Sequence, residues 1–216
     1  AFDNFQKLEE VVLPERLETI KASAFFSCYR LKKINVPKTL RTIASDVFIA
    51  TKIESFSLRR VKKIGNMCFL DSKIKEVYLS KDCRSSSLVF WGCEKLKKVT
   101  LEDGIKKISY GMFCDTALKT IDIPGSVFQI GEDAFADCKK LQKVTLHEGI
   151  KKVGKNAFYN TSLKEITIPS TVTELSKNAF RRESMEKSSL KKVVIRSKNI
   201  KKWGTMVFGA TRDDLV

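Results

Sequence analysis

The thiols are the side chains of this sequence with the widest chemistry, since a thiolate can act as a nucleophile, bind a metal ion or form a disulfide. The chain holds six cysteines: Cys28, Cys68, Cys83, Cys93, Cys114 and Cys138. Structural zinc sites take closely spaced pairs of cysteines, and no Cys-x-x-Cys pair occurs. Disulfides would suit an exported protein, but the positions of three cysteines, described below, favour reduced thiols that serve the fold. We expect no metal site.

A single histidine, His147, limits the acid–base chemistry that the chain could perform. It stands where a predicted strand ends, at a position that other copies of the repeat described below fill with proline or polar residues. We therefore expect it to be exposed and without a chemical role. The motifs HExxH, GxSxG and GxGxxG and the phosphate-binding P-loop are all missing from the sequence. We expect no cofactor and no enzymatic activity.

The composition fits a soluble domain with a strong positive charge. Hydrophobic residues make up 43% of the 216 residues, enough to build a core. The formal net charge of +16 and the pI of about 9.6 predict attraction to acidic partners. No apolar run reaches the 18 or more residues of a membrane-spanning helix, and the first residues, AFDNFQKLEE, do not resemble a signal peptide.

A repeat must position these side chains. Nine segments open on an apolar residue that begins an LxxIxI run, at intervals of 21 to 27 residues. The openings are Leu8, Leu31, Ile53, Ile74, Leu96, Leu118, Leu141, Leu163 and Leu190. The residues three and five positions later are apolar, as Phe56 and Leu58 are in the third copy, which predicts a strand with one buried face. The four prolines follow this strand, where a missing N–H group is tolerated, and a second apolar pair predicts a shorter strand.

Phenylalanine recurs at one fixed position of each copy. Ten of the fourteen phenylalanines occupy it: Phe2, Phe25, Phe48, Phe69, Phe90, Phe113, Phe135, Phe158, Phe180 and Phe208. We expect a stacked internal ladder whose rings lie one strand spacing, roughly 4.8 Å, apart. Cys28, Cys93 and Cys138 each follow a ladder phenylalanine by three residues. Cys93 and Cys138 are thus two coils, roughly 10 Å, apart, beyond the limit of about 7 Å between the Cα atoms of a disulfide.

These features predict one β-rich α/β solenoid over residues 1–216, a right-handed superhelix of about nine coils of 21–27 residues. We expect a parallel sheet of long strands on its concave face, short second strands, and a brief helical or 3₁₀ turn at each Ala-Phe step. Residues 1–7 match the end of a preceding repeat, so we expect a piece of a longer array. The insertion RRESMEKSS (181–189) could be functional, but its place beside the last coil favours capping.

The repeat resembles leucine-rich repeats of the Bacteroides surface protein A type, the BspA-like class. The segments LKTIDIPGSVFQIGEDAFADCKK (118–140) and LKEITIPSTVTELSKNAF (163–180) carry the resemblance, which covers essentially the whole chain. Residues 83–93, CRSSSLVFWGC, depart from it. The resemblance implies a leucine-rich-repeat fold, an extracellular or cell-surface location, binding of host proteins or other cells, and no catalytic residues.

The outward positions of the long strands form the first candidate binding surface. Stacking places Lys33, Asn35, Tyr78, Lys98, Thr100, Asp122, Lys143 and Thr145 on one flat polar face. Repeat arrays bind partners over such faces. The alternative is an ordinary solvated sheet face, because no cluster of Trp, Tyr and Arg stands out.

The outward positions of the short strands form the second candidate surface, which we call the basic stripe. It comprises Arg41, Lys62, Lys63, Arg84, Lys106, Lys107, Lys151, Lys152, Lys201 and Lys202. The stripe could bind polyanions such as sulfated glycans, or it could simply keep the array soluble and its edges apart. Nucleic acid is not expected, because stacking aromatics are not interleaved with the basic residues, Phe128 and Trp203 excepted.

The sequence as a whole favours a non-enzymatic interaction or adhesion module, expected to be monomeric and without membrane insertion. Its expected partner is a protein or a glycan on a host or other cell surface, bound through the long-strand face. Binding of a polyanion through the basic stripe is the alternative.

Overall fold

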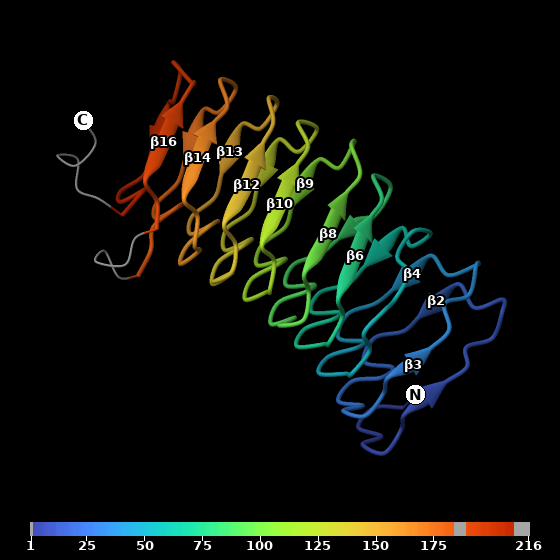
Figure 1. Cartoon of the computed structure of the whole chain (residues 1–216). Coiled ribbons are helices and arrows are strands. Elements are labelled where there is room, and N and C mark those ends of the chain that lie inside the picture. The colour runs from blue at the N-terminus through green and yellow to red at the C-terminus, as the bar shows by residue number, and fades with distance from the viewer. Residues whose placement is uncertain (1, 184–188, 210–216) are drawn as a thin grey trace.

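The computed structural model describes residues 2–183 and 189–209, and the chain forms a parallel β-solenoid of about eight turns. The coils are stacked in one elongated, curved array with the two termini at opposite ends (Figure 1). Every strand pair is parallel and joins equivalent positions of successive coils, as in Ile121 opposite Val144. The predicted repeat architecture is therefore confirmed. Residues 184–188 of the proposed capping insertion lie outside the described residues.

The long strands line one face of the array. They are β1 (Glu10–Val11), β3 (Lys33–Ile34), β6 (Glu76–Leu79), β8 (Lys98–Leu101), β10 (Thr120–Ile123), β12 (Lys143–Leu146), β14 (Glu165–Ile168) and β16 (Lys192–Ile195). Their hydrogen-bonded pairs are β1–β3, β6–β8, β10–β12 and β14–β16. Burial alternates along β10, with Ile121 and Ile123 buried and Thr120 and Asp122 exposed, because successive side chains of a strand point to opposite faces.

The third coil is the exception, and the strand predicted at Phe56 and Leu58 does not form. The other copies place Val or Ile at the position of Phe56. The larger ring is buried and packs against the ladder, with its centroid 5.2 Å from that of Phe48 and 5.5 Å from that of Phe69. An aromatic ring at a position sized for a branched aliphatic side chain accompanies the loss of regular strand geometry in this coil.

The short strands form two sheets behind the long ones. β2 (Thr19–Ile20), β4 (Thr42–Ile43), β5 (Lys63–Ile64) and β7 (Arg84–Ser85) form the first. β9 (Lys107–Ile108), β11 (Gln129–Ile130), β13 (Lys152–Val153), β15 (Glu174–Leu175) and β17 (Lys202–Trp203) form the second. The second, shorter strand predicted for each coil is thus confirmed.

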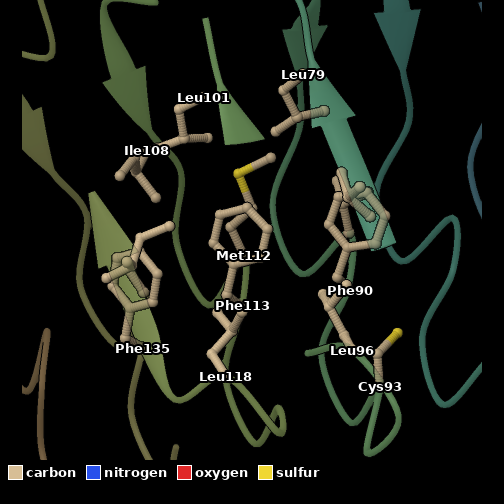
Figure 2. Close-up of a cluster of buried hydrophobic side chains, with 14 of the residues drawn as sticks. Leu79, Phe90, Cys93, Leu96, Leu101, Ile108, Met112, Phe113, Leu118 and Phe135 are labelled. Atoms are coloured by element: carbon tan, nitrogen blue, oxygen red, sulfur yellow. The ribbon is translucent and has the colours of Figure 1, made fainter. Parts of the chain in front are cut away.

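The phenylalanine ladder runs through the whole described array. Neighbouring rings from Phe2 to Phe208 are stacked with centroids 5.1–5.6 Å apart and planes within 28° of parallel. Figure 2 shows three of these rings in a row, with aliphatic side chains on either side. Rings of the inner coils, such as Phe90 and Phe113, are completely buried. The predicted ladder is confirmed, with a spacing slightly wider than that between strands.

The helical or 3₁₀ turns expected at the Ala-Phe steps were a wrong prediction, because the described residues contain no helix. The ladder phenylalanines from Phe25 to Phe158 are flanked, two residues before and two after, by a residue in the left-handed region, and the described residues show one such flank at Phe2, Phe180 and Phe208. The preceding residues, with φ between 51° and 62°, are Ser23, Asp46, Met67, Leu88, Gly111, Asp133, Asn156, Asn178 and Met206. The following ones, with φ between 52° and 69°, are Asn4, Ser27, Ala50, Asp71, Gly92, Asp115, Asp137 and Asn160. A helix needs consecutive negative φ angles, so left-handed residues four apart replace it by two turns.

These left-handed positions predict a test at Asn156, which has φ of 53°. Asn156→Val should lower the free energy of unfolding by about 1–2 kcal/mol, because a β-branched residue is strained in the left-handed region. Asn156→Gly is the matched control, since it removes the same side chain but tolerates the backbone conformation. Urea unfolding of both variants separates the two effects. Equal destabilisation by Val and Gly would contradict the backbone explanation.

Candidate functional site

The thiols of Cys93 and Cys138 form hydrogen bonds inside the core. Cys93 Sγ lies 3.0 Å from the carbonyl oxygen of Phe69, and Cys138 Sγ lies 3.0 Å from that of Phe113. Threonine fills the same position in other coils, and the Thr116 hydroxyl donates to the carbonyl of Phe113 in its own coil at 3.0 Å. The cysteine position of the repeat thus serves to satisfy a buried carbonyl beside the phenylalanine ladder.

Burial also makes these thiols poor nucleophiles. Desolvation raises the pKa of Cys93 to about 12 and that of Cys83 to about 11, and it raises the pKa of Cys68 as well. All six cysteines are free, and all but Cys83 are buried. Within residues 2–183 and 189–209, no three His, Cys, Asp or Glu side chains are grouped as a metal site would require.

Three residues of the predicted long-strand face are occupied by contacts between coils. The ammonium group of Lys33 lies 3.5 Å from the Glu10 carboxylate, and that of Lys98 lies 3.6 Å from the Glu76 carboxylate. The Asn35 side chain accepts from the backbone N–H of Leu13 at 2.5 Å and donates to its carbonyl at 2.9 Å. Asn35 thereby extends the β1–β3 pairing, and its amide is already satisfied.

Three other residues of this face, Tyr78, Thr100 and Asp122, line two hollows. The first, of about 310 Å³, is lined by Ser55, Phe56, Ser57, Leu58, Arg59, Glu76, Val77, Tyr78, Lys98 and Thr100. The second, of about 440 Å³, is lined by Val99, Thr100, Leu101, Asp103, Asp122, Pro124, Gly125 and His147. Thr100 lines both hollows, and we call the two together the strand-face trough. The first hollow is lined in part by the third coil, which lacks the long strand.

Two side-chain pairs mark the ends of the strand-face trough. The Arg59 guanidinium lies over the Tyr78 ring, 4.2 Å from its centroid, in a cation–π arrangement. At the other end, His147 Nε2 is 2.7 Å from Asp122 Oδ1. His147 is exposed as predicted, with 51% of its side chain accessible, but it is not isolated.

The polar groups of the strand-face trough are few and can be described one by one. Among the described residues, the hydrogen-bond partner of the His147 side chain is Asp122, and no serine or threonine hydroxyl is bonded to it. Lys143 and Thr145, also predicted for this face, lie on β12 opposite Thr120 and Asp122. Hydroxyl, carboxylate, imidazole and phenol groups are therefore presented along four successive coils.

Neither the place of Arg59 beside Tyr78 nor the pairing of Asp122 with His147 was predicted from the sequence. Asp122 aligns with Thr145 in the parallel register, so His147 reaches it diagonally from two residues farther along the chain. A comparison of equivalent positions in successive copies of the repeat does not find such diagonal pairs. The available signal was that His147 occurs once, and arginine only as Arg59 and Arg196, at a strand-end position that four other copies fill with proline.

The basic stripe forms in part as predicted. Lys63 is in register with Arg84, and Lys107, Gln129, Lys152, Glu174 and Lys202 follow one another across the second short-strand sheet. All of its members except the half-buried Arg41 are exposed. Glu174 interrupts the stripe, since its carboxylate lies 3.5 Å from Lys152 Nζ and 3.8 Å from Lys202 Nζ.

Parallel coils, a leucine-rich repeat and an internal phenylalanine ladder define the class of the protein as a leucine-rich-repeat solenoid. The family model described as BspA type leucine-rich repeat region matches residues 1–88 and 85–186, with six copies. The chain belongs to this BspA-type leucine-rich-repeat family. No curated protein shows a significant match to the sequence.

Two solved structures share the fold. A leucine-rich repeat protein from Bacteroides ovatus is 24% identical and has a TM-score of 0.84, over 95% of this chain and 54% of that one. A leucine-rich repeat protein from Eubacterium ventriosum is 21% identical and has a TM-score of 0.60, over 92% of this chain and 56% of that one. The chain therefore spans about half the length of these two relatives.

The part of the chain that the structure describes holds no helix long and apolar enough to cross a lipid bilayer.

The raised thiol pKa values predict slow labelling of the folded protein by Ellman's reagent. Only the thiolate reacts, so the rate should rise about tenfold per pH unit at neutral to mildly alkaline pH. Cys83, the least buried thiol, should react first, and Cys83→Ser should remove that phase. Because folding holds the pKa values above 9.0, the free energy of unfolding should fall as pH rises past that value. A full equivalent of fast-reacting thiol at neutral pH in Cys83→Ser would contradict this assignment.

Proposed function

We propose that the protein is a non-enzymatic, monomeric interaction module of a cell-surface or secreted protein. It binds a protein on a host or other cell through the long-strand face, centred on the strand-face trough. The observation that carries this proposal is that an aromatic and a polar hollow share Thr100 and together extend over five successive coils.

The chemistry of the trough supports protein binding. Tyrosine and arginine are the residue types that contribute most to protein–protein interfaces, and Tyr78 and Arg59 are stacked there at 4.2 Å. The Asp122–His147 pair adds hydrogen-bonding groups at the opposite end. Membership of the BspA-type family supports the extracellular location.

Polyanion binding through the basic stripe is a second candidate function. The observation that favours it is the parallel register of Lys63 with Arg84, which places like charges on neighbouring strands. Like charges directly opposite one another destabilise a sheet. A polyanion would relieve this repulsion by neutralising both groups.

Substitutions in the strand-face trough should weaken cell binding. Thr100→Arg fills the point where the two hollows meet, and Tyr78→Ala removes the aromatic contact. Each should weaken binding of the fluorescently labelled chain to cultured mammalian epithelial cells by about tenfold or more, as is typical for the centre of an interface. Flow cytometry at physiological and raised salt measures the effect, which should persist at raised salt.

The matched control is Thr167→Arg, which adds the same charge at the equivalent position of β14, outside the trough. It should leave cell binding within about twofold, because residues outside the centre of an interface contribute little. Equal losses for Thr100→Arg and Thr167→Arg would show that the trough is not the centre of binding. Binding that survives removal of cell-surface proteins by protease would exclude a protein partner.

A further inference from the structure

A third hollow lies in the turn between the long-strand segment and the short strand of the third coil, and we call it the arginine hollow. It has a volume of about 190 Å³ and is lined by Arg41, Arg59, Arg60, Val61, Lys62, Ser80 and Asp82. Arg59 also lines the strand-face trough, so the two depressions adjoin. Arg59 and Arg60 lie outside the basic stripe because they belong to the turn rather than to the strand.

The cations of the arginine hollow are not neutralised by the protein. Four cationic side chains and one carboxylate, that of Asp82, line it, which gives a formal charge of +3. Among the residues that the structure describes, none of the ion pairs includes Arg41, Arg59, Arg60 or Lys62. The neighbouring Lys75, by contrast, has Glu54 as its partner at 2.5 Å. Uncompensated positive charge around a concave surface attracts anions from solution.

Two of the guanidinium groups are held in place before any ligand binds. The Arg41 guanidinium donates to the carbonyl of Lys38 at 2.8 Å and to that of Leu40 at 3.0 Å. The Arg59 guanidinium is held over the Tyr78 ring. Groups fixed in this way lose little conformational entropy on binding. The planar fork of a guanidinium can form paired hydrogen bonds to two oxygens of one tetrahedral oxyanion.

We propose that the arginine hollow binds a sulfo group of a sulfated polysaccharide whose chain continues along Lys63 and Arg84. This inference rests on the polyanion-binding candidate function and gives it a specific site. Arg41, Arg59 and Arg60 donate to the sulfate oxygens, and Lys62 adds charge. Lys63 and Arg84, in register on β5 and β7, extend the positive surface beyond the hollow.

A sulfated polysaccharide fits this surface better than a nucleic acid does. Proteins that bind single-stranded nucleic acids stack successive bases on several aromatic side chains. No aromatic residue lines the arginine hollow, and one face of the adjacent Tyr78 ring is already covered by Arg59. A saccharide chain needs no stacking platform and places its sulfo groups at intervals along a basic surface.

The test is isothermal titration of the whole chain with a heparin oligosaccharide at physiological salt. Arg59→Gln combined with Arg60→Gln should weaken binding by about tenfold or more, because charge-assisted hydrogen bonds in a hollow are lost. The control, Lys151→Gln combined with Lys152→Gln, removes the same charge from the stripe and should weaken binding by less than about threefold. Arg60→Lys keeps the charge but not the fork, and should weaken binding several-fold.

Two further measurements examine the chemistry of the arginine hollow. Asp82→Asn removes the one carboxylate of its lining and should strengthen heparin binding. Chemically desulfated heparin, which keeps its carboxylates, should bind the wild-type chain at least about tenfold more weakly, because the sulfo groups supply most of the counterion release. Arg60→Lys and Asp82→Asn are conservative changes of exposed residues, so they test the site even where the double variant does not fold.

The outcomes distinguish the site from the function on which it rests. Equal losses in the two double variants would overturn the arginine hollow and leave polyanion binding by the stripe in place. Heparin that does not bind the wild-type chain would overturn both. Equal affinity for desulfated heparin would overturn the sulfo group as ligand. Tighter binding of single-stranded DNA, lost equally in the Arg59/Arg60 double variant, would overturn the polysaccharide as occupant.

Discussion

The stacking of equivalent residues from successive coils is the constraint on which this structure depends. A single coil of about 22 residues cannot enclose a phenylalanine ring, and the ladder rings that lie between two others are all buried. Phe90, with a ring on either side, is completely buried, whereas Phe2, with a ladder ring only at Phe25 among the described residues, is 40% exposed. Each coil is therefore stabilised by its neighbours, and the carbonyls beside the rings are satisfied by thiols and hydroxyls of the same stack.

The same register decides the charge of each surface. On the long-strand side, some neighbouring coils carry opposite charges, so that Glu10 meets Lys33 and Glu76 meets Lys98. On the short-strand side, Lys63 meets Arg84 and the repulsion is not compensated within the pair. Charges of the long-strand face are thus paired with one another within the protein. The short-strand face keeps a positive charge that an external anion can neutralise.

Function in a repeat array is best sought where the repetition fails. Side chains that recur in every coil are explained by stacking, whereas Arg60 and Tyr78 occur once each at their positions, and Arg59 has an arginine counterpart only in the last coil. They gather around the third coil, which lacks the long strand and in which Phe56 leans against the ladder. The strand-face trough and the arginine hollow both adjoin this irregular coil, so two hollows accompany a single departure from regularity.

The sequence by itself determined the repeat, the two strands per coil and the phenylalanine ladder, because each of these depends only on the spacing of residue types along the chain. It also contained, unrecognised, Asp, Asn or Gly at many of the positions two residues before and after the ladder rings, where left-handed turns replace the helix that was predicted. Only the tertiary structure decided that Phe56 displaces a strand, that His147 reaches Asp122 diagonally, and that Arg41 joins Arg59 and Arg60 around one hollow. These contacts depend on the offset between coils and on the size of individual side chains, and neither of these is periodic in the sequence.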